Sequence, residues 1–157
     1  MIIDMQKAYY EGHSKLSMDA AVEYINAAVE IFRESKLPII WVQDKSDAEP
    51  GQKGFDLIDS LQPMKEEYKV EKMYGNSFSK TNSLDIINKE KVDTVLITGY
   101  CAEYCVLSTY RGALDLDLTP ILFRGALASG KEENIKFVEN ISDIMSYSVL
   151  KKVLEKN

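Results

Sequence analysis

Histidine is nearly absent from this sequence, since His13 is the only one among 157 residues. Zinc sites of the HExxH or three-histidine type therefore cannot be built from this chain. A Cys–His or Ser–His catalytic pair would have to depend on His13 alone, which is expected to lie in a polar loop. For any nucleophilic thiol in this chain, the natural candidate base is therefore a carboxylate.

Long apolar runs and an excess of positive charge are also missing. No apolar stretch approaches the roughly 18 residues that a membrane span requires, and no signal peptide is visible. The formal net charge of −6 argues against a nucleic-acid surface. We therefore expect a cytoplasmic protein without a membrane or nucleic-acid partner. Met1 begins almost inside the first apolar strand, which leaves open whether residues precede it.

Cysteine is scarce as well, with only Cys101 and Cys105, four positions apart. In a reducing compartment a structural disulfide between them is not expected. The same spacing allows a second interpretation, in which one thiol senses peroxide and the other resolves it.

Apolar runs alternate with segments of helical periodicity along the whole chain, without a linker or repeat. This alternation predicts one domain over residues 1–157, an α/β doubly wound, Rossmann-like α/β/α sandwich with a mostly parallel six-stranded sheet in the order 3-2-1-4-5-6. Ser129 and Glu132 have the spacing of a capping box for the helix that follows. The expected strands are residues 2–3, 39–42, 68–73, 92–98, 119–123 and 144–145. The expected helices are residues 18–35, 55–61, 83–89, 103–116, 129–140 and 149–155.

Cys105 has the most specific chemical context. A β-branched strand ends at Gly99, and a helix is predicted to begin near Glu103. The thiol would then lie in the first helical turn, where unpaired amides and the helix dipole favour an anion and lower a cysteine pKa. The same amides could receive the oxyanion of a tetrahedral intermediate. The alternative is a small buried cysteine that packs helix against sheet.

Asp4 and Lys72 follow other strands of the same predicted sheet. Ligands of such sheets bind beyond the carboxyl ends of the strands, and strand 1 is adjacent to strand 4, so Asp4 is expected near Cys105. Its alternative is an ordinary loop or capping aspartate. Lys72 would be a surface lysine by default, because strand 3 lies about 10 Å from strand 1.

Several ordered segments resemble the isochorismatase-like cysteine hydrolase superfamily, outside its nicotinamidase branch. The strand-turn-helix around Cys105 is the most specific of them, and the match runs in order over about the first 130 residues. The matching segments are Ile2-Ile3-Asp4-Met5-Gln6, residues 38–43, residues 70–72 with Ser77 and Phe78, residues 98–106, Ser108 with Thr109, and Ala113 with Leu114.

The resemblance implies a catalytic triad of Asp4, Lys72 and Cys105. In the family the aspartate takes the thiol proton, the lysine stabilises the thiolate, and the cysteine attacks an amide-type carbonyl to form a thioester that water resolves. The family also has a cis peptide bond before the residue matching Cys101, and the backbone amides of Cys101 and Cys105 would form the oxyanion hole. Its members commonly form dimers or tetramers, so a homodimer or homotetramer is expected.

The sequence departs from the family pattern in three places. Nicotinamidases of this superfamily hold a metal with an aspartate and two histidines after the second strand. Here that stretch reads Asp44-Lys45-Ser46-Asp47, so we expect no metal or other cofactor, although whether Asp44 or Asp47 binds an ion stays open. Isochorismatase itself lacks the nucleophilic cysteine, so Cys105 argues against vinyl-ether hydrolysis. Gly125 replaces an acidic residue often found after the fifth strand.

The predicted function is hydrolysis of a small amide or related C–N bond. Tyr9, Trp41 and Tyr100 are candidate pocket residues, because an aromatic lining suits a small planar substrate. Packing in the core is the alternative for Tyr9 and Trp41. A redox thiol protein using Cys101 and Cys105, or a non-catalytic scaffold of the same fold, are the competing hypotheses.

Overall fold

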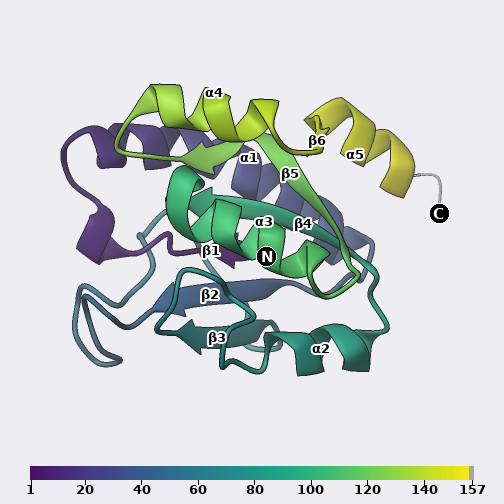
Figure 1. The fold of residues 1–157 in the computed structure, drawn as a ribbon, viewed down its shortest axis with the longest axis horizontal. Helices are drawn as coiled ribbons and strands as arrows, with labels where there is room; N and C mark the ends of the chain where they lie inside the picture. The colour runs from purple at the N-terminus through teal and green to yellow at the C-terminus, as the bar shows by residue number, and fades with distance from the viewer. Residues whose placement is uncertain (156–157) are drawn as a thin grey trace.

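The computed structural model describes residues 1–155 and confirms the predicted doubly wound fold (Figure 1). Six strands form one sheet in the order β3-β2-β1-β4-β5-β6, and every neighbouring pair is parallel. Because all strands run the same way, their carboxyl ends meet at one edge of the sheet. The strands are β1 (Ile2–Ile3), β2 (Ile40–Asp44), β3 (Tyr68–Lys72), β4 (Thr94–Tyr100), β5 (Thr119–Ala128) and β6 (Ile144–Met145).

Helices cover both faces of the sheet, as the parallel topology requires (Figure 1). One core joins Ile2 and Trp41 to the long helix α1 (Gly12–Glu34) and to α5 (Tyr147–Leu154). The other joins Ile3 and Val42 to the opposite layer of helices. That layer contains α2 (Ser83–Glu90), α3 (Leu107–Leu114) and α4 (Glu132–Asn140), and two short turns complete the fold, η1 (Lys7–Tyr9) and the π-helical η2 (Ala102–Val106).

The expected helix over residues 55–61 is wrong. These residues form turns and an isolated antiparallel bridge between Gln6 and Leu57. The amide of Ile58 donates to the Met5 carbonyl at 3.0 Å, and the amide of Lys7 donates to the Asp56 carbonyl at 2.9 Å. The backbone groups of this segment are thus bound to the stretch after β1, and they are not available for a helical ladder.

Other predicted helices differ in their bounds. The helix expected over residues 18–35 begins at Gly12, so His13 is helical and does not lie in a loop. The helix expected over residues 103–116 is a π-helical turn followed by α3, and it ends at Leu114. The capping box is also wrong, because α4 begins only at Glu132 and Lys131 is its N-cap. The Ser129 hydroxyl instead accepts from the Lys131 amide and donates to Glu103 at 3.0 Å.

The turn between β4 and η2 depends on Gly99, which has φ +120°. A Cβ at this position would lie 2.1 Å from the carbonyl oxygen of Ile3. Only glycine allows β1 and β4 to approach this closely, so Gly99 brings the residues after both strands together. Opposite this stretch β5 continues to Ala128, beyond the expected end at residue 123, and its register shifts between Ile97 and Gly99.

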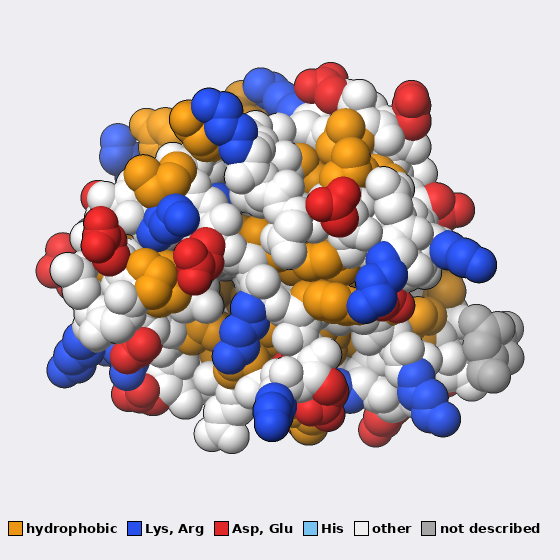
Figure 2. Space-filling view, turned by 90° about the horizontal axis from the view of Figure 1, so that it is seen from below, with side chains coloured by type: hydrophobic (Ala, Val, Ile, Leu, Met, Phe, Trp, Pro, Cys, Tyr) orange, Lys and Arg blue, Asp and Glu red, His pale blue; other side chains and the backbone are white. Residues whose placement is uncertain are grey.

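The outer surface carries charges of both signs. On the side of β3 and α2, blue and red side chains are interspersed with small orange areas (Figure 2). Among the described residues, no helix is long and apolar enough to cross a membrane.

An apolar cavity of about 410 Å³ lies at the amino ends of the strands, opposite the carboxyl edge. Its walls include Met1, Ile40 and Leu96. The amino group of Met1 donates to the Leu96 carbonyl at 2.7 Å, and burial lowers the pKa of this amino group from 8.0 to about 5. The Met1 amino group, which burial favours in its neutral form, therefore lies where the backbone of a preceding residue would continue the hydrogen bonds between β1 and β4.

Three apolar residues added before Met1 are expected to stabilise the fold. In register they would run beside β4 to the level of Thr94, fill the cavity and move the amino group away. The unfolded chain binds a proton at the amino group below pH 8 and the folded chain only below about 5, so the original chain loses stability as pH falls through this window. Urea unfolding should show an advantage of the extended chain that grows from pH 8 to pH 5 by as much as about 4 kcal/mol. An advantage that does not change with pH would contradict the burial of the amino group.

Candidate active site

Reactive side chains from four elements meet at the carboxyl edge of the sheet. Asp4 follows β1, Asp44 ends β2, Lys72 ends β3, and Cys105 lies in η2 after β4. Asp4 adopts φ +52°, a left-handed conformation at the point where the chain leaves β1.

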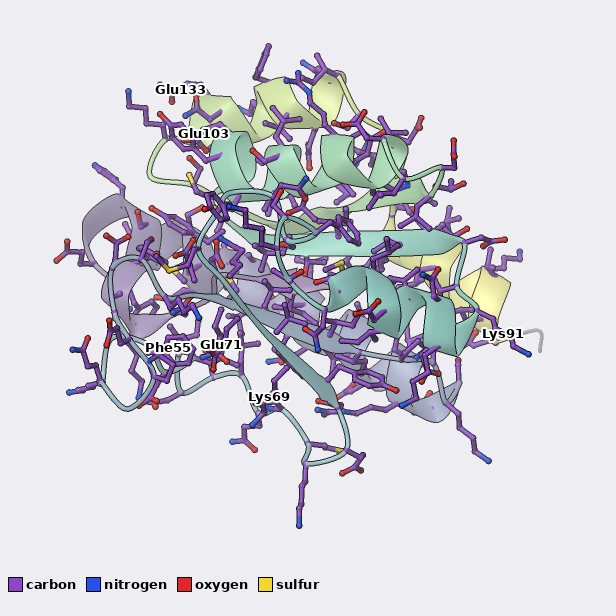
Figure 3. All side chains as sticks on the ribbon, turned by 60° about the horizontal axis from the view of Figure 1, so that its bottom comes forward. Phe55, Lys69, Glu71, Lys91, Glu103 and Glu133 are labelled. Carbon is purple, nitrogen blue, oxygen red and sulfur yellow. The ribbon has the colours of Figure 1, made fainter. Side chains whose placement is uncertain are left out.

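The labelled side chains in Figure 3 mark the two ends of the sheet. Phe55, Glu71 and Glu103 lie at the edge that carries the site, whereas Lys91 lies at the opposite edge. Residues widely separated in sequence therefore share this edge because the strands are parallel.

Lys72 connects the other three groups. Its Nζ atom lies 2.8 Å from Oδ2 of Asp4, 2.6 Å from Oδ2 of Asp44 and 3.3 Å from Sγ of Cys105. The side chain of Lys72 is fully buried, and Asp4 and Asp44 are also buried. A buried ammonium requires anionic partners, and this one contacts two carboxylates and a thiol.

The register of the sheet explains how Lys72 crosses from strand 3 to strand 1. Asp44 of β2 pairs with Lys72 of β3, and the next strand inward is β1. The long side chain of Lys72 lies along the carboxyl edge, beside the end of β2, and reaches Asp4. The expected surface position is therefore wrong, because two carboxylates retain the ammonium inside.

Asp44 is held on both its backbone and its side chain. The side chain of Gln6 donates from Nε2 to the Asp44 carbonyl at 2.9 Å, and its Oε1 accepts from the backbone amide of Asp44 at 2.7 Å. Oδ1 of Asp44 accepts from the amide of Ser46 at 2.7 Å and from its hydroxyl at 2.5 Å. Oδ2 is thereby directed to Lys72.

The turn that carries Cys105 is a π-helical turn, which is wider than a turn of α-helix. The Cys101 carbonyl accepts from the amide of Val106 at 3.2 Å, the bond that defines a π-helical turn. The peptide bond between Tyr100 and Cys101 is cis, which confirms the expectation from the family. Cys105 and Cys101 are free thiols.

Burial raises the pKa values of both Asp4 and Cys105. For Asp4 burial outweighs the attraction of Lys72, and its pKa rises from 3.8 to about 6. For Cys105 burial and the negative charge of Asp4 outweigh Lys72, and its pKa rises from 9.0 to about 12. The expected lowering of the Cys105 pKa by the helix terminus is therefore wrong. Between these two values the Asp4–Cys105 pair holds one proton, which either group can carry.

The other two groups remain charged. Burial opposes the charge of Lys72, but its interactions with Asp4, Cys105 and Asp44 hold its pKa above the ordinary value. Burial likewise opposes ionisation of Asp44, yet hydrogen bonds from Lys72 and Ser46 hold its pKa below the ordinary value.

The residues around Asp44 do not fit the metal site of the nicotinamidases. The only histidine, His13, is exposed on α1, and Asp44 is bonded to Lys72 and Ser46. Oxygen and sulfur atoms of Asp4, Asp44 and Cys105 lie within 4.8 Å of one another, a spacing that suits a cation. The ammonium of Lys72 already contacts all three groups and supplies that charge.

Two of the three candidate pocket aromatics lie beside these groups. The rings of Tyr9 and Tyr100 stack with their centroids 5.4 Å apart. Their hydroxyls are fixed by Asp47 at 3.0 Å and by Ser14 at 2.9 Å. Trp41 has no exposed surface and belongs to the core with α1, as its packing alternative predicts.

Asp44 and Gln6 are the site residues whose roles the sequence did not indicate. Gln6 occurs in a segment that resembles the family and Asp44 in the stretch that departs from it, and the sequence predicted the contacts of neither. The available signal was Asp44 itself, an acidic residue at the end of an apolar strand, as Asp4 is.

The shared proton predicts an unusual pH profile for alkylation of Cys105 by iodoacetamide. The rate should rise up to about pH 6, where Asp4 ionises, and then stay level through neutral pH. A free thiol instead reacts about tenfold faster per pH unit until about pH 8.5. Mass spectrometry of the peptide gives the rate at each cysteine, with Cys101 as internal reference. Asp4→Asn should abolish the inflection near pH 6, and a wild-type profile like that of a free thiol would exclude proton sharing.

Comparison with known proteins agrees with this geometry. Residues 1–141 match the Isochorismatase domain family. The uncharacterized isochorismatase family protein YrdC of Bacillus subtilis is 30% identical over 135 residues, which cover 82% of this chain and 72% of that protein. An isochorismatase-like hydrolase from Alkaliphilus metalliredigens superposes with a TM-score of 0.84 at 25% identity, over 94% of this chain and 85% of the other. N-carbamoylsarcosine amidase from Thermoplasma acidophilum shares the fold, with a TM-score of 0.82 at 23% identity over 93% and 94% of the two chains. The chain belongs to the isochorismatase family and has its hydrolase fold.

Proposed function

We propose that the protein is a cysteine hydrolase that cleaves an amide or related C–N bond of a small molecule. The observation that carries this proposal is the position of the Lys72 ammonium, 2.8 Å from Asp4 and 3.3 Å from Cys105. A nucleophile, a proton acceptor and a fixed cation in contact are the components of covalent acyl transfer.

The proposed reaction begins when Cys105 transfers its proton to Asp4 and Sγ attacks the carbonyl carbon. Lys72 stabilises the thiolate by its charge, and the backbone amides of Cys101 and Cys105 receive the oxyanion. The tetrahedral intermediate collapses as Asp4 returns the proton to the leaving nitrogen, which departs as ammonia or an amine. Asp4 then takes a proton from water, hydroxide attacks the thioester, and the carboxyl product leaves as Sγ regains the proton.

The pKa of Asp4 suits both halves of this reaction. A carboxyl group that titrates at about 6 is ionised at neutral pH and can accept the thiol proton. It is also a stronger base than an ordinary aspartate, which helps it to activate water. The reaction needs no metal or other cofactor, because Lys72 supplies the positive charge.

The aromatic pair supports a small substrate with a planar group. Tyr9 and Tyr100 are half-buried and stacked on each other. Tyr9 feels the charges of Asp44 and Asp4, and Tyr100 those of Cys101 and Cys105, so the pair lies near these groups. We propose that they form one wall of the pocket, whereas Trp41 supports β2 from the core. N-carbamoylsarcosine amidase has the same fold, so carbamoyl compounds and ureides belong in the first substrate screen together with simple amides.

The redox alternative receives less support from the site. Peroxide oxidises thiolates, but burial and Glu103 raise the pKa of Cys101 to about 12, and burial and Asp4 raise that of Cys105 equally. Cys101, the second thiol that this alternative requires, therefore stays protonated at neutral pH, and Cys105 gives up its proton only to Asp4. The contacts of Lys72 with Asp4 and Cys105 favour a catalytic site over the scaffold alternative.

We further propose that the protein is cytoplasmic, forms a homodimer or homotetramer, and acts on a small molecule.

An ammonia-release screen over small amides, ureides and carbamoyl compounds tests this function. For a substrate so found, Cys105→Ala should reduce kcat/KM by at least about 1,000-fold, because no acyl-enzyme can form. Asp4→Asn should reduce it by about 100- to 10,000-fold through loss of the general base. Mass spectrometry should detect the acyl adduct on Cys105 after rapid quenching.

Cys101→Ser is the matched control, since it alters the neighbouring side chain and preserves the backbone amide. It should keep most of the activity. A Cys105→Ala variant that still hydrolysed the substrate would overturn the proposed mechanism, provided that circular dichroism shows both variants folded.

A further inference from the structure

The two carboxylates that contact Lys72 have unequal surroundings. Asp44 is bonded through Oδ2 to Lys72 and through Oδ1 to the amide and hydroxyl of Ser46. Asp4 is bonded to the same ammonium through Oδ2, but its Oδ1 is buried without a hydrogen-bond partner among the described residues. Asp44 is thus solvated by fixed donors as an anion, whereas Asp4 has an oxygen atom available for a proton.

We propose that Asp44 is a positioning residue that acts as the permanent counter-ion of Lys72 and so leaves Asp4 free to exchange the proton of Cys105. The proposal rests on the proposed function, in which Asp4 is the base. It goes beyond the triad, because it assigns a role to a fourth residue and divides the work between two carboxylates.

Electrostatics gives the reason for a second carboxylate. If Asp4 were the only anion beside Lys72, the ion pair would favour the ionised carboxylate and lower the pKa of Asp4. Asp44 shares the ammonium at 2.6 Å and also repels a negative charge on Asp4. Both effects make Asp4 a better proton acceptor. Two carboxylates whose environments separate their pKa values are typical of acid–base sites.

The backbone around Asp44 is built for this role. Gln6 is fully buried and binds both backbone groups of Asp44, and its Nε2 also donates to the Phe55 carbonyl at 3.2 Å. Gln6 lies only two residues after Asp4. One buried amide side chain therefore fixes the distance between the segment that carries the base and the strand that carries its counter-ion.

Few other titratable groups face this pair. Lys72 approaches from β3, Cys105 from η2 and Tyr9 from η1, and the hydroxyl of Tyr9 is bonded to Asp47. Burial and the charge of Asp44 hold the pKa of Tyr9 above its ordinary value, so this phenol stays neutral at neutral pH. The pH dependence of the site near pH 6 therefore belongs to Asp4.

The decisive experiment measures alkylation of Cys105 against pH in Asp44→Asn, and it needs no substrate. Removing the charge of Asp44 should move the acid inflection down by about one pH unit. At pH 5, the rate as a fraction of its own plateau should then increase about fivefold over wild type. Asp47→Asn removes a nearby exposed carboxylate, and its inflection should stay at the wild-type position.

An unchanged inflection in a folded Asp44→Asn variant would overturn the proposal. A purely structural role for Asp44 would alter stability or the plateau rate, and it would leave the inflection in place. Asp44→Glu retains the charge and should restore the inflection toward the wild-type position.

A measurement on the wild type covers the case in which Asp44→Asn does not fold. In a ¹³C NMR titration of aspartate carboxyl groups, Asp4 should titrate near pH 6 and Asp44 below the ordinary range. The reverse order would also overturn the proposal. Failure of the proposed function would look different, because no amide would be hydrolysed while the inflections of the alkylation profile still followed the charge of Asp44.

Discussion

The buried ammonium of Lys72 is the constraint on which the site depends. Taking such a charge out of water costs several kcal/mol unless anions compensate it. Here the compensation comes from Asp44, which ends the adjacent strand β2, and from Asp4, which follows β1 one strand further on. The strand order 3-2-1-4 is therefore also the order in which Lys72, Asp44, the proposed base Asp4 and the proposed nucleophile Cys105 lie along the carboxyl edge.

The charges of this cluster explain how a thiol with a raised pKa could be a nucleophile. At neutral pH the cluster holds the cation of Lys72, the anion of Asp44 and a single negative charge shared by Asp4 and Cys105. Formation of the thiolate moves a proton from sulfur to Asp4 and leaves the net charge of the cluster unchanged. In a medium of low polarity this is much less costly than releasing the proton to water, because no new buried charge is created.

The sequence predicted the fold, but not the local chemistry at the carboxyl ends of the strands. Two strand ends were visible because Asp4 and Gly99 terminate apolar runs, and parallel topology brings strand ends together. The helix expected at residues 55–61 failed because the backbone of that segment is bound to residues 5–8, a tertiary contact that periodicity does not contain. The long reach of Lys72 was equally hidden, since it depends on pairing with Asp44 across β2.

The Cys105 pKa is raised and not lowered, because two opposing effects of different size act on the thiol. A helix terminus favours an anion by about 1 kcal/mol at an exposed site. Burial in a site with a second negative charge acts in the opposite direction, and it prevails here. Helical position can be read from a sequence, whereas burial can be read only from the assembled structure.

The near absence of histidine raises the question of which group can act as a base at neutral pH. An unperturbed imidazole titrates at about 6.5, which makes it the usual base at neutral pH. Burial raises the pKa of Asp4 to about 6, close to that of an imidazole. A carboxylate in this environment can therefore act as a base in place of a histidine. This requires a second anion beside Lys72, because an ion pair with Asp4 alone would lower the pKa of Asp4. In our proposal Asp44 is this second anion. A base of suitable strength is then made from aspartate and lysine, which are common in this sequence, without histidine.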